Sequence, residues 1–312
     1  MIVPLPVGRP PVVVCSTAEG AASLDALGLP VEVVAAHEQG PPPGFAADVL
    51  FGGNGSRDWL LAWRRGASWV HLPGAGIDNV PAGLLDGVVV TNAAGVNARQ
   101  VAEFAMAGVL AFAKRLPEVW GAERVPPGGL DLVHGRRLGV VGFGHVGREV
   151  ARLGRAFGME IVCATRTARP DADGVRFVPL AELAATADHV VVAATASAET
   201  RRLLGEEFFA AVRPGLHLVN VARGSLVDQE ALRAALDDGR VARATLDVTE
   251  PEPLPDGHWL RSHPRVLLSP HLAYSAPGHS EASFERFTAE LRRYLAGEPL
   301  ERVVADNRLL AP

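Results

Sequence analysis

Short apolar runs rich in β-branched residues, each ended by Gly, Pro or Asn, are the feature that most constrains the fold of this chain. In the first hundred residues they lie at 12–16, 31–36, 48–53, 69–74 and 87–92. The runs are apolar throughout rather than alternating, which is typical of strands buried on both faces of a parallel sheet. Helix candidates at 18–28 and 57–66 lie between them. The pattern therefore predicts a doubly wound α/β unit.

The same pattern starts again after the Pro/Gly-rich stretch 125–131 and predicts a second α/β unit. Its predicted strands are 136–142, 159–165, 189–195, 216–222, 243–248 and 265–270. Residues 98–115 carry apolar side chains nearly all round, which indicates a core or interface helix. Residues 281–300 have the period of an amphipathic helix, which we expect to return to the first unit.

Length and composition agree with two globular units and exclude several classes of protein. A chain of 312 residues corresponds to about two domains at roughly 150 residues each. The net charge is −5, and the sequence contains no block of like charges. We therefore expect a small-molecule partner, with no nucleic acid and no membrane. The amino terminus lacks the features of a signal peptide, and the cytoplasm is the expected compartment.

Two residue types also bear on the chemistry. Cys15 and Cys163 each lie in an apolar run without a partner at a metal-site spacing, so both are interpreted as buried packing residues and no residue is assigned to a metal. Lys114 is the single lysine and lies in an apolar helix, so imine chemistry is not expected.

A glycine motif follows the first strand of the second unit. Gly142, Gly144 and Gly147 form G-x-G-x-x-G between a predicted strand and a predicted helix. In that context the glycines permit a tight turn, a close approach to a pyrophosphate and close helix packing. The amino terminus of the helix supplies N–H groups to the anion. The motif predicts a dinucleotide site.

The end of the next strand bears on the choice of dinucleotide. A carboxylate about 20 residues after the glycines would bind the ribose of NAD, but this chain has Thr165 and Arg166 there, with Arg169 close by. A guanidinium suits a 2′-phosphate, which a carboxylate would repel. The sequence therefore favours NADP(H) over NAD(H).

Three polar loops follow later strands, at 220–228, 246–255 and 268–278. With these loops, the sequence resembles the D-isomer-specific 2-hydroxyacid dehydrogenase family over nearly its whole length, in the manner of glyoxylate and hydroxypyruvate reductases. The resemblance rests on HLPGAGIDNVP (71–81), VTNAAGVNARQVAEFAMAGVLA (90–111), GRRLGVVGFGHVGREVA (135–151), ETRRLLG (199–205), RPGLHLVNVARGSLVDQEAL (213–232), ATLDVTEPEPLP (244–255) and SPHL (269–272).

The resemblance implies three catalytic residues. Arg223 matches the family's catalytic arginine, which holds the substrate carboxylate and carbonyl oxygen. His271 matches the general acid, and Glu252 matches the glutamate that pairs with it. The residue types suit the chemistry, because hydride addition to a 2-oxo acid builds negative charge on an oxygen. A carboxylate beside an imidazole also favours its protonated form.

The remaining site assignments concern the cofactor and the substrate. Cofactor-binding residues are predicted to be Gly142, Gly144, His145, Val146, Gly147, Thr165, Arg166, Ala194, Thr195, Ala222 and Asp247. Asp247 resembles a contact of the nicotinamide amide, with capping of a loop as the alternative. The substrate is assigned to Ala75, Gly76, Arg223 and His271. Tyr274 and the run 51–54 are expected near the substrate, while Ala193–Ala196 departs from the family's usual Pro.

The resemblance also implies an architecture: a Rossmann cofactor domain at 96–275 inserted in a flavodoxin-like substrate domain at 1–95 and 276–312. It implies a homodimer. The predicted function is an NAD(P)-dependent oxidoreductase of small 2-oxo or 2-hydroxy acids. Two alternatives stay open: a phosphoglycerate dehydrogenase-like enzyme, without a further regulatory domain after Pro312, and a cofactor-sensing binding protein or corepressor on the same scaffold.

Overall fold

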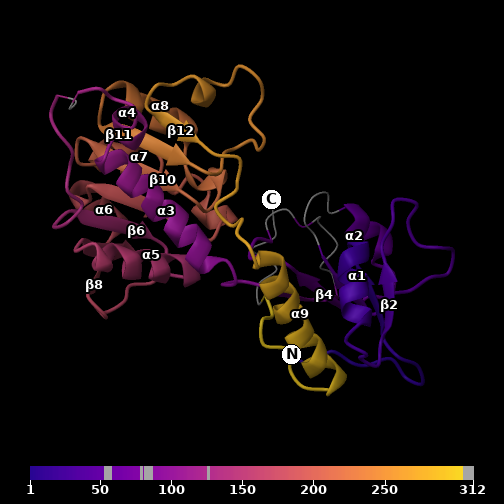
Figure 1. The fold of residues 1–312 in the computed structure, drawn as a ribbon. Helices are drawn as coiled ribbons and strands as arrows, with labels where there is room; N and C mark the ends of the chain where they lie inside the picture. The colour runs from indigo at the N-terminus through magenta and orange to yellow at the C-terminus, as the bar shows by residue number, and fades with distance from the viewer. Residues whose placement is uncertain (53–57, 78–79, 81–86, 125–126, 305–312) are drawn as a thin grey trace. The chain divides into compact units, whose positions relative to one another are not determined.

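The computed structural model describes residues 1–52, 58–77, 80, 87–124 and 127–304. The chain divides into two compact units (Figure 1). Unit 1 comprises Met1–Val96 and Pro277–Pro312, and unit 2 comprises Asn97–Ala276.

Unit 1 contains a parallel sheet of five strands among the residues described. The strands are β1 (Val12–Cys15), β2 (Glu32–Ala35), β3 (Val49–Phe51), β4 (Trp69–Leu72) and β5 (Val89–Asn92). Their order, β2-β1-β3-β4-β5, is that of flavodoxin-like sheets.

Helices cover both faces of this sheet. They are α1 (Ala18–Asp25), α2 (Asp58–Trp63) and α9 (His279–Leu295). Leu24 of α1 and Phe287 of α9 share one buried cluster with Trp69, whereas Trp63 of α2 packs with Leu50 in a second cluster. The carboxyl-terminal helix α9 therefore completes the core of the amino-terminal sheet, as its amphipathic pattern predicts.

Unit 2 contains a parallel sheet of seven strands within the described part of the chain. The strands are β6 (Arg137–Val141), β7 (Glu160–Ala164), β8 (Val175–Phe177), β9 (His189–Val192), β10 (Leu216–Asn220), β11 (Val241–Leu246) and β12 (Val266–Leu268). Their order is β12-β11-β10-β9-β6-β7-β8, so the winding reverses between β6 and β9. This is the order of a Rossmann sheet, in which ligands bind at that switch point.

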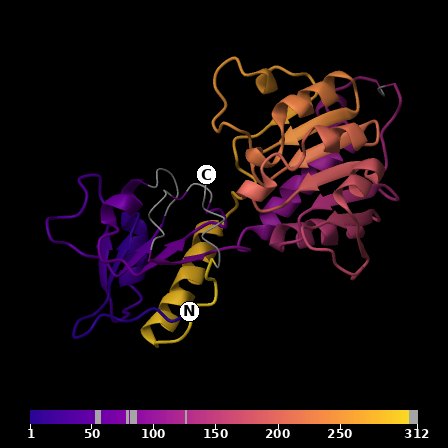
Figure 2. The same cartoon turned by 180° about the vertical axis from the view of Figure 1, so that it is seen from behind.

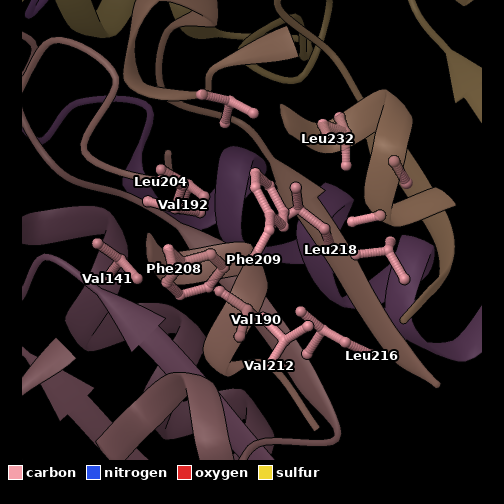
Figure 3. Packing of buried hydrophobic residues seen from close by; sticks show 14 of the residues in the cluster. Val141, Val190, Val192, Leu204, Phe208, Phe209, Val212, Leu216, Leu218 and Leu232 are labelled. Carbon is pink, nitrogen blue, oxygen red and sulfur yellow. The ribbon is translucent and has the colours of Figure 1, made fainter. Parts of the chain in front are cut away.

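Two helical layers cover the two faces of this sheet, as the two opposite views show (Figures 1 and 2). On one face α3 (Ala98–Ala113) and α5 (His145–Ala156) pack against residues such as Val140 and Val191. On the other face lie α6 (Leu180–Thr186), α7 (Glu206–Ala211) and α8 (Gln229–Asp237). There Phe208 and Phe209 lie among Val190, Val192 and Leu218 (Figure 3).

The doubly wound fold class is confirmed, and two short elements were missed. The predicted strands all form, but the apolar pattern did not predict β8 or the single-turn helix α4 (Leu116–Val119). The apolar helix α3 packs on α5 and β10 of its own unit, with Met106 and Val109 buried. Its composition is therefore explained by the core.

Three buried histidines are neutral because burial removes the water that would stabilise a positive charge. His189 and His217 lie side by side in unit 2, with their Nδ1 atoms 3.4 Å apart, and Phe112 stacks on the His217 ring. Burial lowers the pKa of His189 to about 4 and that of His217 well below its usual range. In unit 1 burial lowers the pKa of His71 to about 3.

These lowered pKa values predict a loss of stability in mild acid. Between the ordinary pKa of 6.5 and about 4, the unfolded chain takes up protons at His189 that the folded chain does not, so stability falls as pH falls. The slope is about 1.4 kcal/mol per pH unit for each such histidine. Urea unfolding between pH 7 and pH about 4.5 measures it. His189→Gln is expected to reduce this slope by the contribution of one proton, about 1.4 kcal/mol per pH unit. A slope equal to that of the unmodified protein would contradict the assignment.

Candidate functional site

The glycine motif forms the turn between β6 and α5. Gly142 has φ of 96°, and a Cβ there would lie 2.6 Å from the Cα of Ala194. A Cβ on Gly147 would lie 2.1 Å from the carbonyl oxygen of Gly142. Both positions therefore require glycine because backbone passes too close for any side chain.

Gly144 differs from these two glycines because a Cβ there would have nothing within 4 Å. It is the N-cap of α5, and His145 and Val146 are the first two residues of that helix. His145 is exposed, while Val146 is half-buried against the core. The open space over Gly144 and the first-turn N–H groups of α5 fit the pyrophosphate of a dinucleotide.

The predicted ribose-side residues lie just after β7. The Thr165 hydroxyl donates to the carbonyl oxygen of Thr167 at 2.7 Å, which shapes the turn. The Arg166 guanidinium lies 3.2 Å from the Glu199 carboxylate, and both side chains are about three-quarters exposed. Such an exposed pair is weak, so a phosphate could replace the carboxylate as the partner of Arg166.

Three further cofactor candidates follow the strands beside the switch point. Ala194 and Thr195 come after β9, where the Thr200 hydroxyl donates to the Thr195 carbonyl at 2.9 Å. Ala222 comes after β10, and its N–H donates to the side chain of Asn220 at 3.1 Å. Their positions agree with contacts to a ligand at the carboxyl ends of the strands.

The structure brings His271 and Glu252 together. The Nδ1 atom of His271 lies 2.5 Å from Oε1 of Glu252, across 19 positions in the sequence. The second carboxylate oxygen of Glu252 accepts from the N–H of Thr249 at 3.3 Å. The His271 side chain is 35% exposed, so its ring remains accessible to a ligand while Nδ1 is occupied by the carboxylate.

Arg223 lies on the loop after β10, which packs against the loop that carries Glu252. A Cβ on the next residue, Gly224, would lie 2.0 Å from the carbonyl carbon of Thr249. The Arg223 side chain is half-buried, and its Nη1 donates to the carbonyl of Ala222 at 2.7 Å. Glycine at 224 therefore lets the two loops touch backbone to backbone.

Asp247 has the capping role that the sequence left as an alternative. Its carboxylate is buried and accepts hydrogen bonds from the Ser269 hydroxyl and from the N–H groups of Leu272 and Ala273. A carboxylate offers about four acceptor positions, so three such bonds leave room for one more donor. The predicted contact with the nicotinamide amide stays a prediction.

Sequence reasoning missed Asn220, whose side chain holds the turn that leads to Arg223. Its Oδ1 accepts from Ala222 N and its Nδ2 donates to the Arg223 carbonyl at 2.8 Å. The signal was available: Asn at the end of a strand often caps its own backbone two residues later.

The predicted substrate loop belongs to unit 1 and follows β4. The Asn92 side chain donates to the carbonyl of Ala75 at 2.9 Å, and the hydroxyl of Ser283 donates to that of Pro73 at 2.9 Å. Ala75 is exposed and Gly76 is half-buried. Of the run 51–54, Phe51 stacks on Phe287 with ring centroids 4.1 Å apart, and residues 53–54 lie outside the described residues.

The described residues lack the features of a metal site and of a membrane span. They contain no cluster of three or more His, Cys, Asp or Glu side chains that could hold a metal ion. Within the same ranges, no helix combines the length and the apolar character needed to cross a membrane. Cys15 and Cys163 are buried free thiols, in agreement with their interpretation as packing residues.

The glycine turn at the switch point of a Rossmann sheet defines unit 2 as a dinucleotide-binding α/β unit. Residues 114–273 match the family model described as D-isomer specific 2-hydroxyacid dehydrogenase, NAD binding domain. Glyoxylate reductase of Thermococcus gammatolerans is 36% identical over 68% of this chain and 68% of its own length. The D-3-phosphoglycerate dehydrogenase of Methanocaldococcus jannaschii is 32% identical over 74% of this chain but 46% of its own length.

A solved structure gives the same result. The D-isomer specific 2-hydroxyacid dehydrogenase of Xanthobacter autotrophicus Py2, in complex with NADPH and MES, is 28% identical with a TM-score of 0.81. The match covers 96% of this chain and 99% of that one. The chain therefore belongs to the D-isomer specific 2-hydroxyacid dehydrogenase family, and it is an oxidoreductase that uses a nicotinamide cofactor.

The contrast between two glycines gives a test of the cofactor site. Gly144→Ala is expected to leave the melting temperature unchanged, because nothing in the described chain lies near the added Cβ, while weakening cofactor binding by about tenfold or more. Gly147→Ala should instead lower stability by roughly 1–3 kcal/mol, because its Cβ would overlap the Gly142 carbonyl. Fluorescence titration with NADPH and thermal unfolding measure the two effects. Unaltered cofactor affinity in Gly144→Ala would place the pyrophosphate elsewhere.

Proposed function

We propose that this enzyme reduces small 2-oxo acids of the glyoxylate or hydroxypyruvate type to D-2-hydroxy acids, using Arg223, His271 and Glu252. The proposal rests on the 2.5 Å contact between His271 and Glu252. The loop that carries Glu252 also touches the loop that carries Arg223. The glyoxylate reductases among the relatives support this choice of substrate.

Each of the three side chains has a separate part in the reaction. Arg223 binds the substrate carboxylate and the carbonyl oxygen, where its positive charge stabilises the oxyanion that develops. His271 donates a proton to that oxygen from Nε2, because Nδ1 is bonded to Glu252. Glu252 orients the ring and stabilises the imidazolium. A nicotinamide cofactor, when bound, supplies the hydride to the substrate carbon.

The other predicted residues bind the two ligands. Gly142, Gly144, His145, Val146 and Gly147 present the glycine turn and the first turn of α5 to the pyrophosphate. The segments after β9, β10 and β11 contribute Ala194, Thr195, Ala222 and Asp247 to the rest of the cofactor. In unit 1, Ala75 and Gly76 offer main-chain N–H groups to the substrate carboxylate, which suits a loop of small residues.

NADP(H) is the proposed cofactor. Thr165 and Arg166 follow β7, where a carboxylate that selects NAD would lie, and the exposed Arg166–Glu199 pair leaves the guanidinium available to a 2′-phosphate. The NADPH complex of the Xanthobacter relative supports the assignment.

The proposal also includes assembly and location. We expect a homodimer formed through unit 2, where Trp120, Leu130 and Leu132 are 75%, 50% and 69% exposed. Exposed apolar side chains of this kind are typical of interfaces, and sedimentation velocity tests the assembly state. The buried free thiols of Cys15 and Cys163 are compatible with the reducing cytoplasm that we propose.

A panel of 2-oxo acids, assayed with NADPH and NADH in parallel, tests substrate and cofactor together. We expect the highest kcat/KM for glyoxylate or hydroxypyruvate with NADPH. Arg166→Ala should raise the KM for NADPH by about tenfold and leave that for NADH unchanged, because only NADPH carries the 2′-phosphate. Arg202→Ala, at another exposed arginine, serves as the matched control.

Two results would overturn parts of the proposal, one from that panel and one from the same assay run in the oxidative direction with D-2-hydroxy acids. A clear preference for NADH in the unmodified enzyme would reject the cofactor assignment. Faster oxidation of D-3-phosphoglycerate than of any small 2-hydroxy acid would favour the phosphoglycerate dehydrogenase alternative, which the relative from Methanocaldococcus supports.

Replacement of His271 separates an enzyme from a cofactor-sensing protein on the same scaffold. His271→Ala should lower kcat by roughly 10²–10⁴ while NADPH binding persists, because the proton donor is lost but the glycine turn is not. His134→Ala, at an exposed position, is the control. An unchanged kcat in His271→Ala would exclude His271 as the general acid.

A further inference from the structure

Two buried polar residues lie at the ends of neighbouring strands and are joined through their backbones. Asn220 ends β10, and Asp247 follows β11 directly. The two strands pair in register there, and the N–H of Asp247 donates to the carbonyl of Asn220 at 3.0 Å. Asn220 is 1% exposed and Asp247 is 2% exposed.

Asn220 bonds to the backbone of the loop that carries Arg223. Its side-chain oxygen accepts from Ala222 N at 3.1 Å, and its side-chain nitrogen donates to the Arg223 carbonyl at 2.8 Å. The side-chain amide of Asn220 thus holds the peptide groups on both sides of the peptide bond that joins Ala222 to Arg223.

Asp247 bonds to the loop that carries His271 at four points. Its carbonyl accepts from His271 N at 2.8 Å. Its carboxylate accepts from the Ser269 hydroxyl at 2.6 Å and from the N–H groups of Leu272 and Ala273, each at 2.9 Å. His271 has φ of 52°, a left-handed conformation that residues other than glycine adopt only when their surroundings enforce it.

We propose that Asn220 and Asp247 are positioning residues that set Arg223 and His271 relative to each other. The direct bond between them makes one hydrogen-bonded unit of both loops. Without Asp247 the backbone at His271 would relax from its left-handed conformation, and the ring would leave Glu252. The roles of Arg223 and His271 themselves rest on the proposed function.

The donors and acceptors of the two side chains decide which isosteric substitutions break these hydrogen bonds. In Asp247→Asn one side-chain oxygen becomes an NH₂ group, which cannot accept from a backbone N–H. In Asn220→Asp the side-chain donor becomes an oxygen that faces the Arg223 carbonyl, so two acceptors oppose each other. Neither change alters the volume of the side chain, so packing is preserved.

The first test uses the enzyme without cofactor or substrate. In the unmodified protein the Nδ1–H proton of His271, bonded to Glu252, should give a downfield NMR resonance that Glu252→Gln removes and thereby assigns. Asp247→Asn should broaden or abolish this resonance. A nicotinamide contact cannot produce that result in the absence of cofactor, so retention of the resonance at full intensity would overturn the proposal.

The second test measures turnover with NADPH and the best 2-oxo acid. We expect Asp247→Asn to lower kcat roughly 10- to 100-fold with a smaller change in the KM for NADPH, because the misplaced group acts in the chemical step. Asn220→Asp should raise the KM for the 2-oxo acid, since it displaces the arginine that binds the carboxylate. Ser269→Ala removes only the hydrogen bond to Asp247. It should change kcat and the resonance in the same direction as Asp247→Asn, but to a smaller extent. This variant keeps the test decisive if Asp247→Asn does not fold.

The matched control is Asp188→Asn. Asp188 precedes β9 at the opposite edge of the same sheet, where its carboxylate accepts from the N–H of Arg137 at 2.8 Å and pairs with Arg213 at 2.7 Å. We expect this variant to lose stability but to keep the His271 resonance and kcat. Equal losses of kcat in Asp188→Asn and Asp247→Asn would show a general effect of stability and overturn the positioning role. If the unmodified enzyme reduces no 2-oxo acid, the proposed function fails, while the NMR result still decides the positioning of His271.

Discussion

The parallel alignment of β6, β9, β10, β11 and β12 is the constraint on which the rest of unit 2 depends. Because these strands run in one direction, the segments that follow them all emerge at the same edge of the sheet. The glycine turn, Arg223, Asp247 and His271 are spread over more than a hundred positions and nevertheless belong to this one edge. The apolar clusters on the two faces, built around α3 with α5 and around α6 to α8, hold the strands in that order. Function at the edge thus depends on packing at the faces.

At that edge, glycines and short polar side chains have complementary effects on the backbone. Gly142, Gly147 and Gly224 lie where a neighbouring backbone leaves no space for a Cβ, so they allow loops to approach. Asn220 and Asp247 then fix those loops through hydrogen bonds to main-chain groups. In unit 1 Asn92, the last residue of β5, bonds to the loop of Ala75 in the same way. Close approach and fixed hydrogen bonds together give catalytic side chains a defined geometry, which proton transfer requires.

The sequence predicted the doubly wound fold and its strands because each buried strand is a continuous apolar run, a local signal. It missed β8, whose three residues alternate too briefly to show a period, and α4, which is a single turn. The glycine motif was readable because strand, turn and helix are contiguous in the chain. The pairing of His271 with Glu252 came only from resemblance, since nothing local to either residue indicates a partner 19 positions away. Asn220 was overlooked although its Asx pattern is local.

The sequence by itself determined the class of fold, the dinucleotide turn and the family, because these follow from hydrophobic period, contiguous glycines and ordered motifs. Only the tertiary structure decided that Asp247 builds the loop of His271, that Gly224 lets the loops of Arg223 and Glu252 touch, and that α3 belongs to the core of its own unit. The physical reason is that each of these facts is a contact between segments distant in sequence. Such contacts depend on strand order and on the space left between backbones. Neither can be predicted from a short stretch of the sequence.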